Sequence, residues 1–209
     1  VRRNRVRDGL VYLQISRGAA ARDHAFPSAD VPPSVVVTAK SVDRAKQEAG
    51  AARGISVVTR PDIRWGRCDI KTVGLLPNIL AKQDAIEAGA ADAWLVDDMG
   101  TITEGTASNA WIVDQDGVIR TRDTQANILH GITRAAILTI AAEQGLKLEE
   151  RGFTPDEVKR AREAFYTNAS GFATPVVAID RVAIGNGKPG PVAQRLRELY
   201  LQRAEPAAI

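Results

Sequence analysis

Thr103-Glu-Gly-Thr-Ala-Ser-Asn109 begins the stretch of sequence that decides the fold, and Leu129-His-Gly-Ile-Thr-Arg134 ends it. Between these segments, residues 110–121 form two apolar runs around Asp116-Gly117, a dipeptide typical of the tight turn of a β-hairpin. Residues 133–144 then form the best predicted helix in the chain, and Gly145 is a typical helix stop. The stretch therefore predicts a carboxylate followed by small polar residues, a hairpin and a helix N-terminus, in that order.

Further elements are predicted on both sides of this stretch. Residues 75–88 form a predicted helix, with Pro77 in the first turn, where proline is tolerated. Helices are also predicted from residue 154 and over 192–203, and strands over 10–16, 34–39, 55–59, 93–96, 175–180 and 182–184. Because strands and helices are intermixed and several strands form hairpin-like pairs, we expect an α/β (α+β) chain with a largely antiparallel or mixed sheet.

Composition narrows the class of protein. The chain has 209 residues, enough for one large domain or two small ones, and a net charge of only +3. The arginines near its start lack the interleaved aromatic residues of a nucleic-acid patch, and no apolar run reaches the ~20 residues of a membrane span. Cys68 is the single cysteine and cannot form an internal disulfide, which favours a reducing, cytoplasmic setting. We expect no nucleic-acid partner, no membrane partner and no metal site.

The segment Arg64-Trp-Gly-Arg-Cys-Asp-Ile-Lys71 is the first candidate for chemistry. Its lysine could simply be a surface residue whose apolar stem packs on the protein. In the alternative interpretation it is a nucleophile. A free lysine, with a pKa of about 10.4, is a poor nucleophile at neutral pH. Burial and nearby cations, here Arg64 and Arg67, lower such a pKa and favour Schiff-base formation.

Two features of the deciding stretch could serve a bound cofactor. Glu104 stands among turn-forming residues, and its carboxylate could face a protonated heterocyclic nitrogen, which would make the ring an electron sink. Gly131, Ile132 and Thr133 begin the best predicted helix, and free N–H groups at a helix N-terminus favour a phosphate.

The order of these features resembles the signature of the class IV aminotransferases, the fold type IV enzymes that depend on pyridoxal 5'-phosphate. Trp111 departs from the Phe or Tyr usual in the family, which we interpret as a packing change. The resemblance covers essentially the whole chain. It implies a small N-terminal α/β domain, here incomplete, over residues 1–45 and an interdomain linker over 46–50. Residues 51–209 would form a larger domain with a barrel-like mixed sheet and helices.

The resemblance also implies roles for individual residues. Lys71 would be the catalytic lysine that forms the Schiff base and shuttles the proton, and Glu104 the partner of the ring nitrogen. Arg64 matches an arginine near the phenolic oxygen, and Leu129 a residue packed on the ring face. The phosphate contacts would be Ile132, Thr133 and Ala169. Because Ala169 stands where a hydroxyl residue is usual, only its backbone could serve, and Ser170 would compensate.

Within the family, the segment that starts at Val11 and runs through Arg22-Asp-His24 to Pro27 is most similar to D-amino-acid aminotransferases. The resemblance assigns the substrate α-carboxylate to Arg22 and His24, and a guanidinium can make a two-pronged contact with a carboxylate. We expect transamination of D-alanine with 2-oxoglutarate, giving pyruvate and D-glutamate, by a homodimer that binds D-amino acids and 2-oxo acids.

Three alternatives stay open at this point. A branched-chain L-amino-acid aminotransferase and an aminodeoxychorismate lyase share the fold and the lysine, and a truncated, inactive cofactor-binding module belongs to a different class of function. Family members carry a phosphate-binding arginine and a substrate-pocket tyrosine in a segment before the equivalent of Val1. We therefore expect an N-terminal portion that this sequence does not contain.

Overall fold

The computed structural model describes residues 1–125 and 127–204. They divide into two compact units, Val1–Gln47 and a second unit that begins at Glu48. None of the helices in these described ranges is long and apolar enough to cross a membrane.

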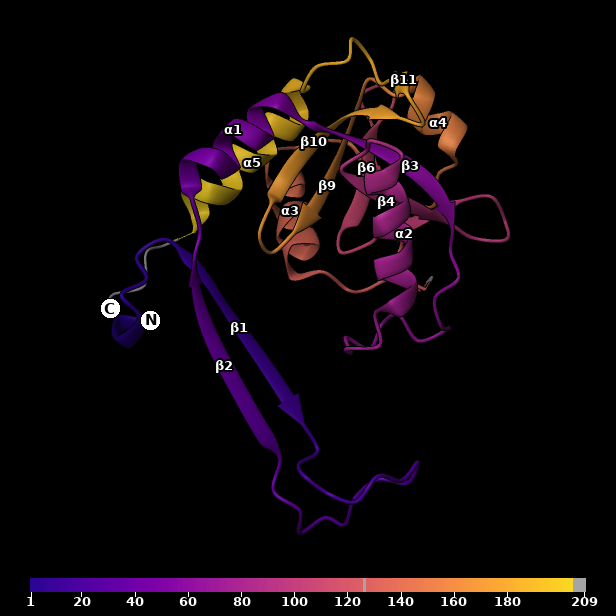
Figure 1. Ribbon diagram of the computed structural model, residues 1–209. Helices are drawn as coiled ribbons and strands as arrows, with labels where there is room; N and C mark the ends of the chain where they lie inside the picture. Colours follow the sequence, from indigo (N-terminus) through magenta and orange to yellow (C-terminus); the bar gives the residue numbers. More distant parts are fainter. Residues whose placement is uncertain (126, 205–209) are drawn as a thin grey trace. The chain divides into compact units, whose positions relative to one another are not determined.

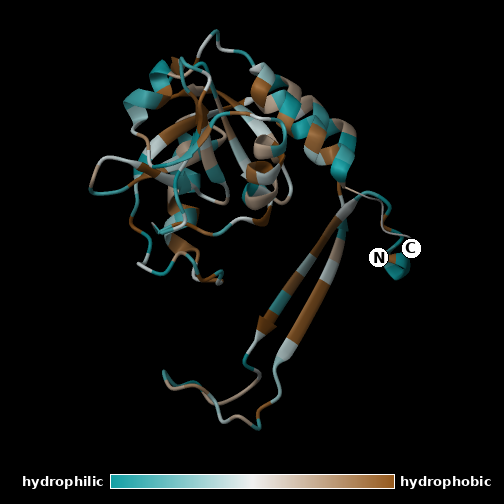
Figure 2. Ribbon diagram, turned by 180° about the vertical axis from the view of Figure 1, so that it is seen from behind, coloured by the Kyte–Doolittle hydropathy of each residue, from teal (hydrophilic) through white to brown (hydrophobic). Residues whose placement is uncertain are grey.

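The first unit is a two-stranded antiparallel ribbon, preceded by a short 3₁₀ turn, Arg2–Asn4. Strand β1 (Gly9–Ser16) pairs with β2 (Ser34–Ser41) along its full length, from Gly9 opposite Ser41 to Ser16 opposite Ser34. The apolar side chains of both strands are exposed on both faces of this ribbon, and Figure 2 shows the hydrophobic colour along them. The predicted strands over 10–16 and 34–39 are confirmed.

Helix α1 (Arg44–Arg53) contains the residues of the predicted interdomain linker. The linker was expected over 46–50, and those residues lie inside a continuous helix. Ala, Lys, Gln, Glu and Arg are strong helix formers, and they outweigh the cost of Gly50 in the middle. The boundary between the two units falls within this helix, after Gln47. The assignment of residues 1–45 and 51–209 to separate domains stays a proposal.

The second unit is built on a mixed nine-stranded sheet with strand order β5-β4-β3-β10-β9-β6-β7-β8, in which β11 pairs with β10 (Figure 1). Three of its pairings are parallel, β3 with β4, β3 with β10, and β7 with β8; the others are antiparallel. Its strands are β3 (Ile55–Pro61), β4 (Asp92–Val96), β5 (Ile102–Gly105), β6 (Asn109–Val113), β7 (Ile119–Thr121), β8 (Leu148–Glu150), β9 (Glu163–Asn168), β10 (Phe172–Ile179) and β11 (Val182–Ala183).

This sheet curls into the predicted barrel-like form. Strand β5 lies at one end of the strand order, yet residues 106–108 alone connect it to β6, with β4, β3, β10 and β9 between them in the sheet. So short a connection requires the sheet to bend until β5 and β6 are neighbours. A core of apolar side chains from β3, β4, β5, β6, β9 and β10 fills the inside of the curl.

Helices cover the outside of the curled sheet. Successive side chains of a strand point to opposite faces, so Ala110 and Ile112 enter the inner core while Trp111 and Val113 face outward. Helices α3 (Ile132–Glu143) and α5 (Pro191–Arg203) pack against that outer face, and α2 (Leu76–Glu87) packs against β3 and β4 (Figure 1). Trp111 stacks on Phe165, with ring centroids 5.3 Å apart. The structure thus accommodates tryptophan at this position as a packing residue.

Helix α4 (Pro155–Arg160) begins as predicted at Thr154, which forms a capping box with Glu157. Strands β5, β8 and β9 were not predicted. The helices over 75–88, 133–144 and 192–203 are confirmed to within one residue at each end.

Candidate functional site

Glu104 is the next-to-last residue of strand β5, just before the short connection to β6, and it is 4% exposed. Its carboxylate accepts hydrogen bonds from Arg64, from the Asn109 amide at 3.0 Å and from the backbone N–H of Leu129 at 3.2 Å. Burial raises the pKa of Glu104 above its ordinary value, although the Arg64 guanidinium opposes this rise. The structure therefore brings three of the predicted site residues, Arg64, Glu104 and Leu129, into direct contact.

Arg64 is held between two carboxylates. Its Nε donates to Asp62 Oδ1 at 2.9 Å, its Nη2 donates to Asp62 Oδ2 at 2.7 Å, and its Nη1 donates to Glu104 Oε1. Burial alone would raise the pKa of Asp62, yet hydrogen bonds from Arg64 and Thr103 hold that pKa below its usual value. The pKa of Arg64 is in turn raised, because Asp62 and Glu104 outweigh the effect of burial.

Ile132 and Thr133 form the first turn of α3, close in the chain to Leu129. The N-cap residue Gly131 has an extended backbone conformation, and α3 has no side-chain cap. A Cβ on Gly131 would lie 2.2 Å from Asn109 Oδ1, so only glycine fits against Asn109 here. The Asn109 amide also donates to Leu129 O at 3.0 Å. Asn109 thus connects the Glu104 carboxylate to the start of α3.

Lys71 lies in the irregular segment between β3 and α2, and its side chain is exposed. Several apolar neighbours in this segment are exposed too, among them Trp65, Ile70 and Val73. The two cations expected to influence Lys71, Arg64 and Arg67, are both paired with carboxylates. Arg64 binds Asp62 and Glu104, and Arg67 binds Asp69 with two contacts of 2.8 Å. The role of Lys71 stays a prediction.

Ala169 lies in the turn between β9 and β10 and is exposed. Ser170, which was expected to compensate for the missing hydroxyl, donates its own hydroxyl to Asn168 Oδ1 at 3.3 Å. The Asn168 amide in turn donates to Ala107 O at 3.4 Å and ties this turn to the β5–β6 connection.

Arg22 and His24 belong to the first unit, in the long loop between β1 and β2, and both are exposed. Arg22 lines a hollow of about 400 Å³ within this loop, which also holds Arg17 stacked on the Phe26 ring at 3.7 Å. His24 does not line that hollow, and its backbone N–H donates to Asp23 at 2.6 Å.

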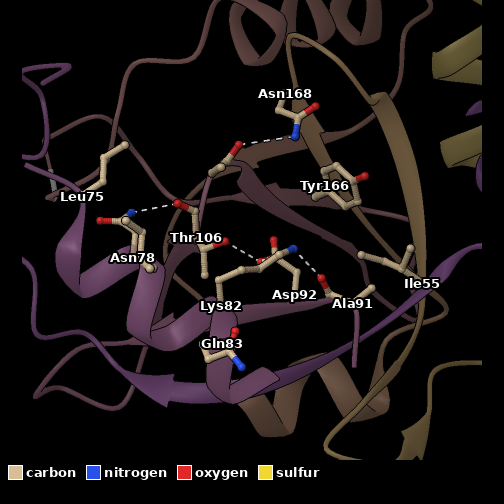
Figure 3. A pocket seen from close by; sticks show the side chains of 12 residues that line it. Ile55, Leu75, Asn78, Lys82, Gln83, Ala91, Asp92, Thr106, Tyr166 and Asn168 are labelled. Carbon is tan, nitrogen blue, oxygen red and sulfur yellow. Dashed lines mark hydrogen bonds and ion pairs between the residues drawn. The ribbon is translucent and has the colours of Figure 1, made fainter. Parts of the chain in front are cut away.

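A second hollow, of about 420 Å³, lies beside α2 and the β5–β6 connection (Figure 3). Figure 3 shows Asn78 and Lys82 of α2 pointing toward Thr106 and Asp92, and Thr106 Oγ1 donates to Asp92 Oδ1 at 2.5 Å. None of the nine predicted site residues lines this hollow. Its polar residues instead fix the connection that follows Glu104.

Sequence reasoning missed two members of the buried cluster, Asp62 and Asn109. Asp62 stands two residues before Arg64, and this acid–base spacing just after a predicted strand was a usable signal. Asn109 was quoted as part of the deciding stretch but was given no role. Its contact with Glu104 spans the turn between β6 and β5, and β5 was not predicted.

The chain is similar to known proteins over most of its length. The family model described as amino-transferase class IV matches residues 1–179. A D-alanine aminotransferase of Staphylococcus aureus (strain N315) is 40% identical over 207 residues, which is 99% of this chain and 72% of that protein. One of Bacillus licheniformis is 42% identical over 194 residues, 93% of this chain and 67% of the other.

Solved structures show the same fold. A T.th. branched-chain amino acid aminotransferase, complexed with N-(5'-phosphopyridoxyl)-L-glutamate, superposes with a TM-score of 0.86 at 32% identity. The match covers 96% of this chain and 66% of that chain. A putative 4-amino-4-deoxychorismate lyase from Legionella pneumophila has a TM-score of 0.84 at 21% identity and shows the fold alone.

Proposed function

This chain belongs to the class IV aminotransferase family, and we propose that it transaminates D-amino acids with pyridoxal 5'-phosphate as cofactor. The observation that carries the proposal is the buried Glu104 carboxylate, held by Arg64 and Asn109 next to the uncapped N-terminus of α3. This arrangement offers an anion for a cationic ring nitrogen and N–H groups for a phosphate. Similarity to D-alanine aminotransferases over almost the whole chain supports the D-amino-acid substrate class.

The residues of the second unit fit pyridoxal phosphate. Ser108 Oγ is buried and has no hydrogen-bond partner among the described residues, so it can serve a bound group. A Cβ on Gly105 would lie 2.3 Å from Ser108 Oγ, so glycine is needed to leave this hydroxyl in place. The first N–H groups of α3 at Ile132 and Thr133, with the backbone of Ala169, would hold the phosphate, and Leu129 would contact the ring.

When bound, pyridoxal phosphate supplies an electron sink that stabilises negative charge at the substrate α-carbon. Lys71 Nζ would hold the cofactor covalently and, once released, would take the proton from the substrate α-carbon. The Glu104 carboxylate would keep the ring nitrogen protonated. The Arg22 guanidinium would bind the α-carboxylate of the substrate in two-pronged fashion, and the His24 imidazole would add a further hydrogen bond.

The proposal extends to finer points that the family alone does not decide. The amino-group acceptor is 2-oxoglutarate, the assembly is a homodimer, and the single cysteine favours a cytoplasmic location. Sedimentation of the purified protein at several concentrations tests the assembly, and activity with a series of 2-oxo acids tests the acceptor.

The first experiment is an absorbance spectrum of the purified protein with pyridoxal phosphate, followed by D-alanine or L-alanine. We expect a band from the protein-bound cofactor that changes with D-alanine and stays unchanged with L-alanine. The structural similarity to branched-chain aminotransferases makes the L-specific enzyme the second candidate. A band that responds only to L-amino acids would select it, and a protein that binds no cofactor would contradict both.

A further inference from the structure

Asp62 is the charged residue of the buried cluster to which the family resemblance gave no role. The side chains of Asp62, Arg64 and Glu104 are 9%, 6% and 6% exposed, so all three charges are largely removed from water. Asp62 lies just after β3, and Thr103 of β5 donates its hydroxyl to Asp62 Oδ2 at 2.7 Å. The backbone N–H of Arg64 also donates to Asp62, at 3.1 Å. Asp62 is thus fixed both by strand β5 and by its own segment.

The geometry gives Asp62 the larger share of the guanidinium. Asp62 accepts from Nε and Nη2 of Arg64, which is the side-on, two-pronged arrangement that binds a carboxylate most strongly. Glu104 accepts from Nη1. The one positive charge of Arg64 is therefore shared between two carboxylates, and Asp62 accepts two of its three hydrogen bonds to them.

The charge balance of the cluster follows from this sharing. Two carboxylates and one guanidinium carry a net charge of −1 when all are ionised, and an unbalanced buried charge is costly. The Cys68 thiol also interacts with these charges, and burial raises its pKa and keeps it neutral. A cationic ring nitrogen placed against Glu104 would bring the cluster to neutrality.

We propose that Asp62 is a positioning residue for Glu104: by taking up the charge of Arg64, it leaves Glu104 as a full anionic partner for a protonated ring nitrogen. This inference rests on the proposed function. Without Asp62, Arg64 would pair with Glu104 alone, and a ring nitrogen would face a neutral ion pair in place of an anion. One nearby charge changes the proton affinity of a buried group by about tenfold or more, so the effect is measurable.

The test is Asp62→Asn, which keeps the shape of the side chain and removes its charge. Asp97→Asn is the matched control, because Asp97 also binds an arginine, Arg122, and a threonine, Thr101, but makes no contact with Glu104. The first readout needs no cofactor: ¹³C NMR of protein with labelled glutamate follows the pKa of Glu104, whose signal is assigned by its absence in Glu104→Gln. We expect Asp62→Asn to lower this pKa and the control to leave it unchanged.

The second readout is the ¹⁵N chemical shift of the ring nitrogen in protein loaded with labelled pyridoxal phosphate. We expect a protonated nitrogen in wild type and in Asp97→Asn, and a nitrogen with about tenfold lower proton affinity in Asp62→Asn. A ring nitrogen equally protonated in Asp62→Asn would overturn the proposal. If that variant does not fold, Asp62→Glu decides: it keeps the charge, so loss of the ring-nitrogen proton there would refute the charge argument.

The two readouts separate this inference from the function on which it rests. If wild type binds no pyridoxal phosphate, the proposed function fails, whatever the NMR titration shows. If wild type binds the cofactor but the pKa of Glu104 is the same in wild type and Asp62→Asn, only the role of Asp62 fails.

Discussion

Replacing Gly131 by alanine tests whether Asn109 couples the Glu104 carboxylate to the start of α3. The backbone of Gly131, with φ of −64°, suits any residue, so the substitution introduces a clash without backbone strain. The new Cβ would lie 2.2 Å from Asn109 Oδ1, which is closer than real contacts allow. Asn109 is 5% exposed and has little room to move. Its displacement would break the two 3.0 Å hydrogen bonds to Glu104 and Leu129 O.

The cost follows from these contacts. Overpacking a buried position costs about 1–3 kcal/mol, and leaving a buried polar group unsatisfied costs about 1–3 kcal/mol. Because the two effects partly overlap, we expect Gly131→Ala to lower the free energy of unfolding by about 2–4 kcal/mol. For a protein of this size, such a loss lowers Tm by roughly 4–16 °C.

The assay is thermal and urea unfolding of the protein, together with its affinity for pyridoxal phosphate measured by fluorescence. Gly50→Ala is the control, because a Cβ there meets nothing within 4 Å and Gly50 lies inside α1. Alanine in the middle of a helix should stabilise the control by about 0.5–1 kcal/mol. If Gly131→Ala has the stability and cofactor affinity of wild type, Asn109 can move without cost and does not couple the position of Glu104 to that of α3.

Three further predictions concern single side chains. Lys71→Ala should abolish the absorbance band of the protein-bound cofactor and all turnover, and turnover at the wild-type rate would remove Lys71 from the site. Arg22→Lys should raise KM for D-alanine more than it lowers kcat, because an ammonium cannot make the two-pronged contact; steady-state kinetics decide, and an unchanged KM would contradict the assignment. Burial would raise the pKa of Glu157, but hydrogen bonds from Arg151 and Thr154 hold this pKa below its ordinary value of 4.5. Around that pH the folded state therefore binds fewer protons than the unfolded state. The stabilisation of the fold by ionised Glu157 is therefore full above about pH 4.5 and is lost as the pH falls through the folded pKa. Urea unfolding should show that Glu157→Gln is less stable than wild type near pH 7 and that this difference vanishes in acid.

The elements predicted well from the sequence are those with strong local signals. Helix α4 has the capping residue Thr154, and α3 has a glycine at each end of an apolar run. Strand β9 was missed although it is central, because its stability comes from pairing with β10 and β6 and from burial of Phe165, none of which is visible locally. The helical conformation of residues 46–50 was not predicted, although the boundary between the two units falls among these residues.

The residues of the candidate site likewise divide into those that the sequence indicated and those that it did not. The deciding stretch led to Glu104, Leu129 and the start of α3, since the fold family determines their order along the chain. The pairing of Arg64 with Asp62 was missed although the two residues are close in the chain. Their contacts with Glu104 and Thr103 form through tertiary packing, which sequence spacing does not show. The exposure of Lys71 agrees with one of its two interpretations, that of a surface residue, and leaves its catalytic role a prediction.

The strand order of the second unit has a consequence for the time course of folding. Strand β3 is paired on one side with β4, the next strand along the chain, and on the other side with β10. The hydrogen bond between Thr59 of β3 and Asp180, just after β10, joins residues 121 positions apart. The segment from β3 to β5 contains Asp62, Arg64 and Glu104, so these charges can meet early through short-range pairings. Closure of the sheet must wait for β10, and contacts of such long sequence separation form slowly. We therefore expect the ion pairs of the site to assemble, during synthesis and refolding, before the barrel that shields them from water is complete.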